Sequence, residues 1–322
     1  MQLTLDAYVS ATLFDRAGKA IFALGDGRVC FEGGAEVQAH DGAVLAAALH
    51  PSGDGVVTGG DDGRLMWVRA SGAETLAEIR GGWIECVATS DESGLIAFAS
   101  GRDLHVRDSK DSDFSRTFAH PRAVSGIAFD PKGRRVATAT YGGVNLWYAR
   151  IADQKPGVLK WAGSHTGVIW SPDGKFIITA MQDAQLHGWR VADEKNLRMG
   201  GYPAKIRSLA FLSKGALLAT SGANGLVAWP FAGANGPMGK QAAEVGYDES
   251  AVVLWVATAP SKSFAAAGLD DGRVWAAELS GSSVKTLKAD KGEPVSALAM
   301  SADGRRVAWG CEDGQAGVAE LD

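Results

Sequence analysis

Histidine is the side chain in this sequence best suited to chemistry near neutral pH, because a neutral imidazole can accept a proton or bind a metal ion. His165 occupies a position at which comparable segments of the chain carry the apolar residues Val9, Val44, Ile84, Val124, Ile206 and Val295. Breaks in a local pattern concentrate at functional sites. One interpretation is therefore a catalytic or metal-dependent site built around His165 and neighbouring acids. The alternative is a loop shifted by one residue, which would make His165 an ordinary structural histidine.

Other reactive residue types do not form a recognisable motif. Ser, His and Asp are plentiful, but none falls in a nucleophile elbow, a phosphate-binding loop or a zinc motif. Asp61-Asp62 and Asp270-Asp271 resemble fragments of calcium loops, yet glycine follows at once, which is typical of hairpin turns. Three cysteines, Cys30, Cys86 and Cys311, lack metal-site spacing, and we expect them to be reduced and buried. We therefore expect no catalytic residue, no bound metal and no cofactor.

The elements that must position these residues are short strands in a repeating unit. Val124 to Trp147 reads as an apolar strand, a turn at Asp130-Pro131-Lys132-Gly133, a second strand, a glycine turn and a third strand. Similar units recur along the chain, each marked by a glycine in its first turn: Gly18, Gly53, Gly94, Gly133, Gly174, Gly215 and Gly304. One more unit has its first turn at Ala259-Pro260-Ser261-Lys262. The result is eight units, numbered one to eight below, with a period of roughly 41 residues, as in propeller blades.

The units resemble WD40 repeats. The first turn of that family, Ser-Pro-Asp-Gly, is matched by Trp170-Ser171-Pro172-Asp173-Gly174, Leu49-His50-Pro51-Ser52-Gly53 and Met300-Ser301-Ala302-Asp303-Gly304. The second turn is matched by Asp26-Gly27, Asp62-Gly63, Asn224-Gly225, Asp271-Gly272 and Asp313-Gly314, and the closing aromatic by Phe31, Trp67, Trp147, Trp189 and Trp229. The resemblance covers nearly the whole chain, although the repeats are degenerate.

This resemblance implies an all-β fold, a single β-propeller domain over residues 1–322 built from four-stranded antiparallel blades. The repeat count predicts eight blades. The alternative is seven, with unit seven rejected because its first turn lacks glycine and Trp275 stands one position early. An outer strand precedes each unit from the second onward, whereas none follows unit eight. We therefore expect the strand Gln2 to Leu5 to complete the last blade and close the ring.

The resemblance also implies a hydrogen-bonded set of His, Ser or Thr, Asp and Trp that ties a blade together. Unit two offers His40, Thr58, Asp61 or Asp62, and Trp67, whereas unit four offers His120 and Trp147 but has Tyr141 near the Asp position. Most other units lack the histidine, so the sets are expected to be partial.

Composition narrows the functional classes. A net charge of -5 gives no sign of nucleic-acid binding, and no apolar run is long enough to span a membrane. The first residues also lack the features of a signal peptide, which favours a cytoplasmic protein. We expect a monomer.

In WD40 propellers, the loops leading into the first strands and the second turns share one face, where partners usually bind. Here that face is rich in carboxylates and is called the acidic face below; the first turns form the opposite, basic face. Eight residues are predicted to contact the partner: Tyr8, Asp62, Trp83, Tyr141, His165, Tyr202, Asp271 and Asp313. Aromatic anchors with surrounding charge are typical of protein interfaces. We therefore predict a non-enzymatic scaffold that binds a peptide or protein segment carrying Lys or Arg.

Overall fold

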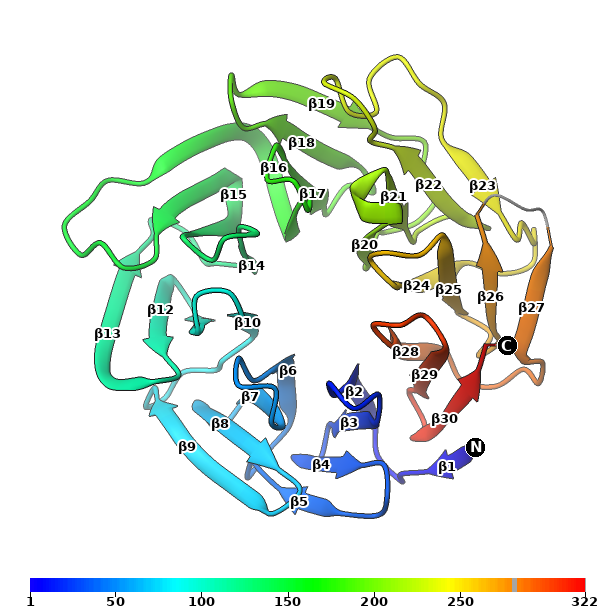
Figure 1. The fold of residues 1–322 in the computed structure, drawn as a ribbon, viewed down its shortest axis with the longest axis horizontal. Helices are drawn as coiled ribbons and strands as arrows, with labels where there is room; N and C mark the ends of the chain where they lie inside the picture. Colours follow the sequence, from blue (N-terminus) through cyan, green and yellow to red (C-terminus); the bar gives the residue numbers. More distant parts are fainter. Residues whose placement is uncertain (280–282, 322) are drawn as a thin grey trace.

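Antiparallel sheets arranged in a ring make up the fold of the computed structural model (Figure 1), which describes residues 1–279 and 283–321. The innermost strand of each sheet faces the centre of the ring, and the later strands lie progressively further out (Figure 1). Only one helical turn interrupts the strands in these residues, the 3₁₀ helix η1 (Ser213–Gly215). No helix in the described ranges is long and apolar enough to cross a bilayer.

Six of the sheets have four strands each, in sequence order from the centre outward. The first three are β2 (Val9–Phe14), β3 (Ala20–Leu24), β4 (Arg28–Phe31) and β5 (Glu36–Gln38); β6 (Val44–Leu49), β7 (Val56–Gly60), β8 (Arg64–Arg69) and β9 (Gly72–Glu78); and β10 (Cys86–Ser90), β11 (Leu95–Ser100), β12 (Asp103–Asp108) and β13 (Asp111–Ala119). Two more are β20 (Leu209–Leu212), β21 (Leu217–Thr220), β22 (Leu226–Pro230) and β23 (Ala243–Val245); and β24 (Val253–Thr258), β25 (Phe264–Leu269), β26 (Val274–Glu278) and β27 (Val284–Lys288). The last is β28 (Val295–Met300), β29 (Arg306–Cys311) and β30 (Gln315–Glu320), completed by β1 (Gln2–Thr4).

The remaining sheet has six strands and contains units four and five together. Its strands are β14 (Gly126–Phe129), β15 (Arg135–Tyr148), β16 (Gly157–Trp170), β17 (Phe176–Met181), β18 (Leu186–Arg190) and β19 (Lys195–Met199). Two of these are double-length: β15 supplies the second and third strands of unit four, and β16 supplies its outer strand and then the first strand of unit five. Tyr141 of β15 and Ser164 of β16 are paired in the ladder, and this pairing joins the unit-four part of the sheet to the unit-five part.

Seven sheets, rather than eight, therefore form the ring, and the prediction of eight separate blades is corrected. The reason is the continuous pairing through β15 and β16, which carries two sequence units in one hydrogen-bonded sheet. The route to seven also differs from the alternative that rejected unit seven. That unit forms an ordinary four-stranded sheet, β24 to β27, and Trp275 is buried in it.

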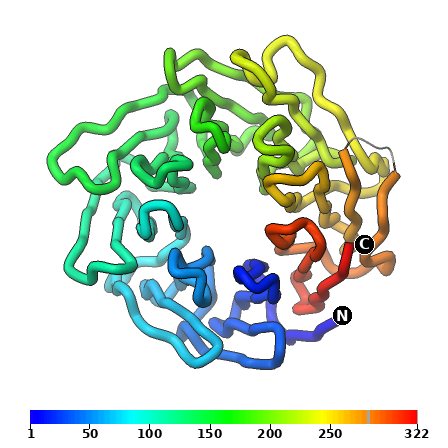
Figure 2. Tube along the Cα trace, viewed as in Figure 1, coloured from blue at the N-terminus to red at the C-terminus, as the bar shows by residue number. Residues whose placement is uncertain are grey.

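Closure of the ring occurs as predicted. Strand β1 pairs antiparallel with β30, with Gln2 opposite Gly317 and Thr4 opposite Gln315. The Met1 amino group donates to the Val318 carbonyl oxygen at 2.7 Å, and Val318 N–H donates back to Met1 at 2.9 Å. Figure 2 shows the two ends of the chain side by side.

The first turns also confirm the repeat. All seven marker glycines, Gly18, Gly53, Gly94, Gly133, Gly174, Gly215 and Gly304, have positive φ, between 62° and 87°. Left-handed backbone carries a steric penalty for residues with a Cβ, so glycine is the residue that makes these turns without strain. In unit seven, where no glycine is present, Lys262 N–H donates to the Ala259 carbonyl oxygen at 3.0 Å and closes the turn.

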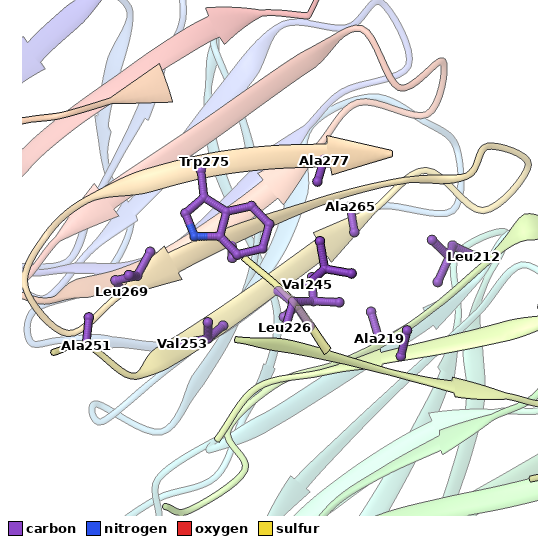
Figure 3. Packing of buried hydrophobic residues seen from close by; sticks show 13 residues of the cluster. Leu212, Ala219, Leu226, Val245, Ala251, Val253, Ala265, Leu269, Trp275 and Ala277 are labelled. Atoms are coloured by element: carbon purple, nitrogen blue, oxygen red, sulfur yellow. The ribbon is translucent and has the colours of Figure 1, made fainter. Parts of the chain in front are cut away.

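The hydrophobic core lies between neighbouring sheets. In Figure 3, Leu212, Ala219, Leu226 and Val245 from one sheet face Val253, Leu269 and Trp275 from the next. Alanines such as Ala265 and Ala267 allow the sheets to approach closely beside the larger side chains. Each sheet is therefore stabilised mainly by its two neighbours, as expected for a repeat that cannot bury both faces alone.

Candidate interaction face

The hydrogen-bonded set of units two, four, five and six contains a buried threonine on the second strand. These residues are Thr58, Thr138, Thr179 and Thr220. In unit two, the His40 ring contacts Thr58 Oγ1 at 2.8 Å through Nε2, and its Nδ1 donates to the Asp62 carboxylate at 2.9 Å. In unit four, His120 Nε2 lies 2.9 Å from Thr138 Oγ1 and accepts from Trp147 Nε1 at 2.9 Å. These contacts confirm partial sets of the WD40 kind.

His165 belongs to the hydrogen-bonded set of unit five, although it occupies the position that is apolar in other units. It pairs with Met181 where the pairing of β16 with β17 begins, as Val9 pairs with Leu24 between β2 and β3. Its Nδ1 lies 2.8 Å from Thr179 Oγ1, and its Nε2 donates to the Trp161 carbonyl oxygen at 3.1 Å.

The exposed fraction of His165 is 0%, and burial lowers its pKa. Both ring nitrogens are engaged, so neither is left for a metal ion or a proton transfer. The interpretation of His165 as a catalytic or metal residue, and its predicted contact with a partner, are both wrong. Among the described residues, no group of three or more His, Cys, Asp or Glu side chains is arranged to hold a metal.

The residue that replaces the expected histidine in unit five is Trp161. In units two and four the histidine stands 18 residues before the threonine, and Trp161 stands at that distance from Thr179. Its ring stacks on His187 with 3.9 Å between centroids. Burial lowers the pKa of His187 to about 4, so this buried histidine is neutral at pH 7.

Tyr202 takes the same position in unit six. Its hydroxyl contacts Thr220 Oγ1 at 2.6 Å and accepts from Trp229 Nε1 at 2.6 Å. Burial raises the pKa of Tyr202 to about 12, although both hydrogen bonds oppose this shift. Tyr202 was predicted as a partner contact on spacing alone. Its polar end is instead used inside the sheet, and only part of the ring is exposed.

Two of the predicted carboxylates are also held by internal partners. Burial raises the pKa of Asp62, but hydrogen bonds from Arg64 N–H, His40 and Asp41 N–H lower it below its usual range. Asp271 pairs with Arg273 at 2.8 Å and with Lys291 at 3.1 Å, and these contacts outweigh burial to lower its pKa. Neither carboxylate is a free charge on the surface, which corrects their predicted role.

The other four predicted residues are exposed. Tyr8 and Trp83, in the loops leading into β2 and toward β10, are 45% and 60% exposed. Tyr141 is 64% exposed but lies within β15, where the sequence predicted the second turn of unit four. Asp313 lies in the second turn of the last unit, where it accepts from Gln315 N–H at 3.0 Å. The backbone contact of Gly25 N–H with the Tyr8 carbonyl oxygen, at 2.7 Å, places the leading loop of unit one beside its second turn.

One pocket at the centre of the ring was missed at the level of sequence. It encloses about 510 Å³ and lies between the first strands of units five, six and seven. Lys205, Arg207 and Trp255 line it, together with Thr166 and the apolar Val168 and Leu209. A signal in the sequence could have found it. Every unit except the fifth has an apolar residue just ahead of or at the start of its first strand, and most of these units follow it with serine or leucine, whereas Ile206 is followed by Arg207.

Comparison with known proteins agrees with this geometry. The sequence profile of the WD domain, G-beta repeat, matches residues 34–67 and 112–147, which include units two and four up to their closing tryptophans. No curated protein matches the chain. Among solved structures, the crystal structure of the computationally designed Ika8 protein has a TM-score of 0.78 and covers 99% of this chain and 98% of its own, at 17% identity. At that identity the likeness concerns the fold alone.

The ring of antiparallel sheets defines a β-propeller. Its repeat units carry the WD40 turns, the closing tryptophans and the threonine-centred sets, and two of them match the WD40 profile. The chain is therefore a β-propeller with WD40-like repeats.

Proposed function

We propose that this protein is a non-enzymatic scaffold whose acidic face binds a peptide or protein segment carrying Lys or Arg. The observation that supports the proposal is the exposure of three large aromatic side chains, Tyr8, Trp83 and Tyr141, from three different units. We take them to lie on the acidic face, where exposed aromatic side chains are typical of interaction sites. Their rings offer a large contact area at a small entropic cost.

The same predicted face carries carboxylates without an ion-pair partner among the described residues. They are Asp61, Asp183, Glu312 and Asp313, which lie in second turns of units two, five and eight. Exposed carboxylates of this kind increase the rate of association with a basic segment and select against acidic ones. The aromatic residues would supply most of the affinity, and the acids most of the selectivity. Cytoplasmic location and a monomeric state stay predictions from the sequence.

The test is selection of binders from a random peptide library displayed on phage, followed by measurement of Kd. We expect the enriched peptides to carry Lys or Arg, and the double variant Trp83→Ala, Tyr141→Ala to weaken their binding at least about tenfold. Tyr148→Ala is the matched control, since Tyr148 is also exposed but ends β15 on the opposite side. Enrichment of peptides without basic residues, or equal loss in the control, would contradict the proposal.

Charge is tested separately with Asp61→Lys and Glu312→Lys, which leave the internal contacts of Asp62 and Asp271 intact. We expect a lower association rate and a weaker dependence on salt, with a smaller effect on dissociation. Unchanged association kinetics would remove the steering role of the acidic face.

A further inference from the structure

Two cations and a tryptophan line the central pocket. Among the ion pairs and side-chain hydrogen bonds of the described residues, none involves the Lys205 ammonium or the Arg207 guanidinium. The Trp255 indole Nε1 is shielded from solvent and has no hydrogen-bond partner among the described residues. All three residues line one pocket of about 510 Å³.

The backbone of the pocket holds these groups in place. Arg207 N–H donates to Ser221 Oγ at 3.0 Å, which fixes the start of the first strand in unit six. Ser208 Oγ then donates to the Val256 carbonyl oxygen at 2.9 Å and so links this strand to the one that carries Trp255. The cations, on the segment leading into β20, and the indole, on β24, are therefore presented by two adjacent units that a direct hydrogen bond holds together.

The charge of Arg207 acts on the acidic face. Burial and the charge of Glu312 raise the pKa of Tyr8, and the Arg207 charge opposes them.

We propose that the central pocket binds a carboxylate attached to an apolar body. A guanidinium presents paired N–H donors that match the two oxygens of a carboxylate, and the neighbouring ammonium adds a second charge. Val168, Ile169 and Leu209 provide an apolar wall for the rest of the ligand. Thr166 is not a free donor, because its hydroxyl donates to the Ala180 carbonyl oxygen at 3.3 Å.

Such a carboxylate has two sources, a small organic acid or the C-terminal carboxylate of a peptide. The probes are therefore benzoate, a hexapeptide with an apolar C-terminal residue and a free carboxylate, and the same peptide with a C-terminal amide. Binding is followed through the indole N–H signals of the full-length protein in ¹H–¹⁵N NMR spectra, with Trp255→Phe used to assign the Trp255 signal.

We expect the Trp255 signal to shift with saturation when a carboxylate is added. The double variant Lys205→Gln, Arg207→Gln should weaken binding at least about tenfold, because charge-assisted hydrogen bonds are lost. Arg102→Gln, Arg122→Gln is the matched control: it removes the same charge from exposed loops of the same face and should leave binding unchanged. Preference for benzoate over the peptides identifies a small-molecule site, and preference for the free-acid peptide over the amide identifies a C-terminus site.

Three results would overturn the proposal. The first is that no probe gives a saturable shift. The second is that the amide and the free acid bind equally while benzoate does not bind. The third is that the control variant weakens binding as much as the double variant does. The outcome does not depend on the proposed scaffold function, because the probes carry no basic residue and the readout is not competition with a partner. Failure of the aromatic variants in peptide selection and failure of this titration are therefore separate results.

Discussion

Tyr202 takes the position that a histidine occupies in units two and four, and this substitution shows how far residue spacing predicts a role. The resemblance to WD40 repeats correctly predicted His40 and His120 as structural residues, because their type and position matched the family. Tyr202 matched only in position, so it was predicted as a partner contact. Asp62 was predicted both as a member of the hydrogen-bonded set of unit two and as a partner contact. Its contact with His40 confirms the first role, whereas spacing alone did not show how many N–H groups already bind this carboxylate.

The Tyr202 hydroxyl is expected to contribute to stability. Tyr202→Phe leaves Trp229 Nε1 without its acceptor and Thr220 Oγ1 without one partner, which should lower the free energy of unfolding by about 1–3 kcal/mol. Urea unfolding measures this change. Tyr247→Phe, at a tyrosine that is 65% exposed, is the control and should change stability little. Equal stability of both variants would show that the buried hydroxyl contributes nothing.

His187 makes stability depend on pH. Folded His187 stays neutral down to about pH 4, whereas its ordinary pKa is 6.5, so the unfolded chain takes up the proton first. Stability is therefore complete above pH 6.5 and falls as the pH decreases toward 4. A shift of this size corresponds to roughly 3 kcal/mol. Urea unfolding at several pH values should show this loss, and His187→Gln should reduce it; the same pH dependence in both proteins would exclude His187 as its source.

Among the elements, β15 and β16 explain why the predicted number of separate sheets was wrong. Every predicted outer strand is present, because alternation and turn residues are local signals. Whether two neighbouring units share hydrogen bonds is not a local property. Here the connection from the outer strand of unit four to the first strand of unit five is so short that one strand, β16, serves both. Unit four also lacks the Asp of the second turn and has Tyr141-Gly142-Gly143 instead.

Gly143 is expected to be essential for this double sheet. It has φ of 137°, and a Cβ there would lie 2.0 Å from the Leu159 carbonyl oxygen. Gly143→Ala should therefore lower the free energy of unfolding by more than about 2 kcal/mol, combining backbone strain with a clash against a paired strand. Gly142→Ala is the matched control in the same turn: φ is 96°, nothing lies within 4 Å, and only the strain applies. A loss no larger than in the control would mean that the strands separate freely.

At the scale of the whole molecule, side-chain hydrogen bonds also join neighbouring units. Ser296 Oγ donates to the Val9 carbonyl oxygen at 2.7 Å across the junction between the last and first units. Ser125 makes the same kind of contact to the His165 carbonyl oxygen between units four and five. The ring closure was predictable because the chain lacks an outer strand after unit eight. The central pocket was not, since its lining comes from three successive units whose residues, from Thr166 to Trp255, come together only in the folded ring.

Removal of residues 1–5 tests how much the closing strand contributes to the ring. Strand β1 covers the edge of β30, and Leu5 is buried among Val9 and Phe14 of the first sheet. The truncated protein should unfold several degrees lower and should aggregate, because an uncovered strand edge can pair with another chain. Thermal unfolding with light scattering measures both effects. The control Gln2→Ala, Thr4→Ala keeps the backbone pairing and alters only outward side chains, so it should behave as the original protein. If the truncated protein unfolded at the same temperature as this control and did not aggregate, contacts such as that of Ser296 would be sufficient to hold the first and last units together.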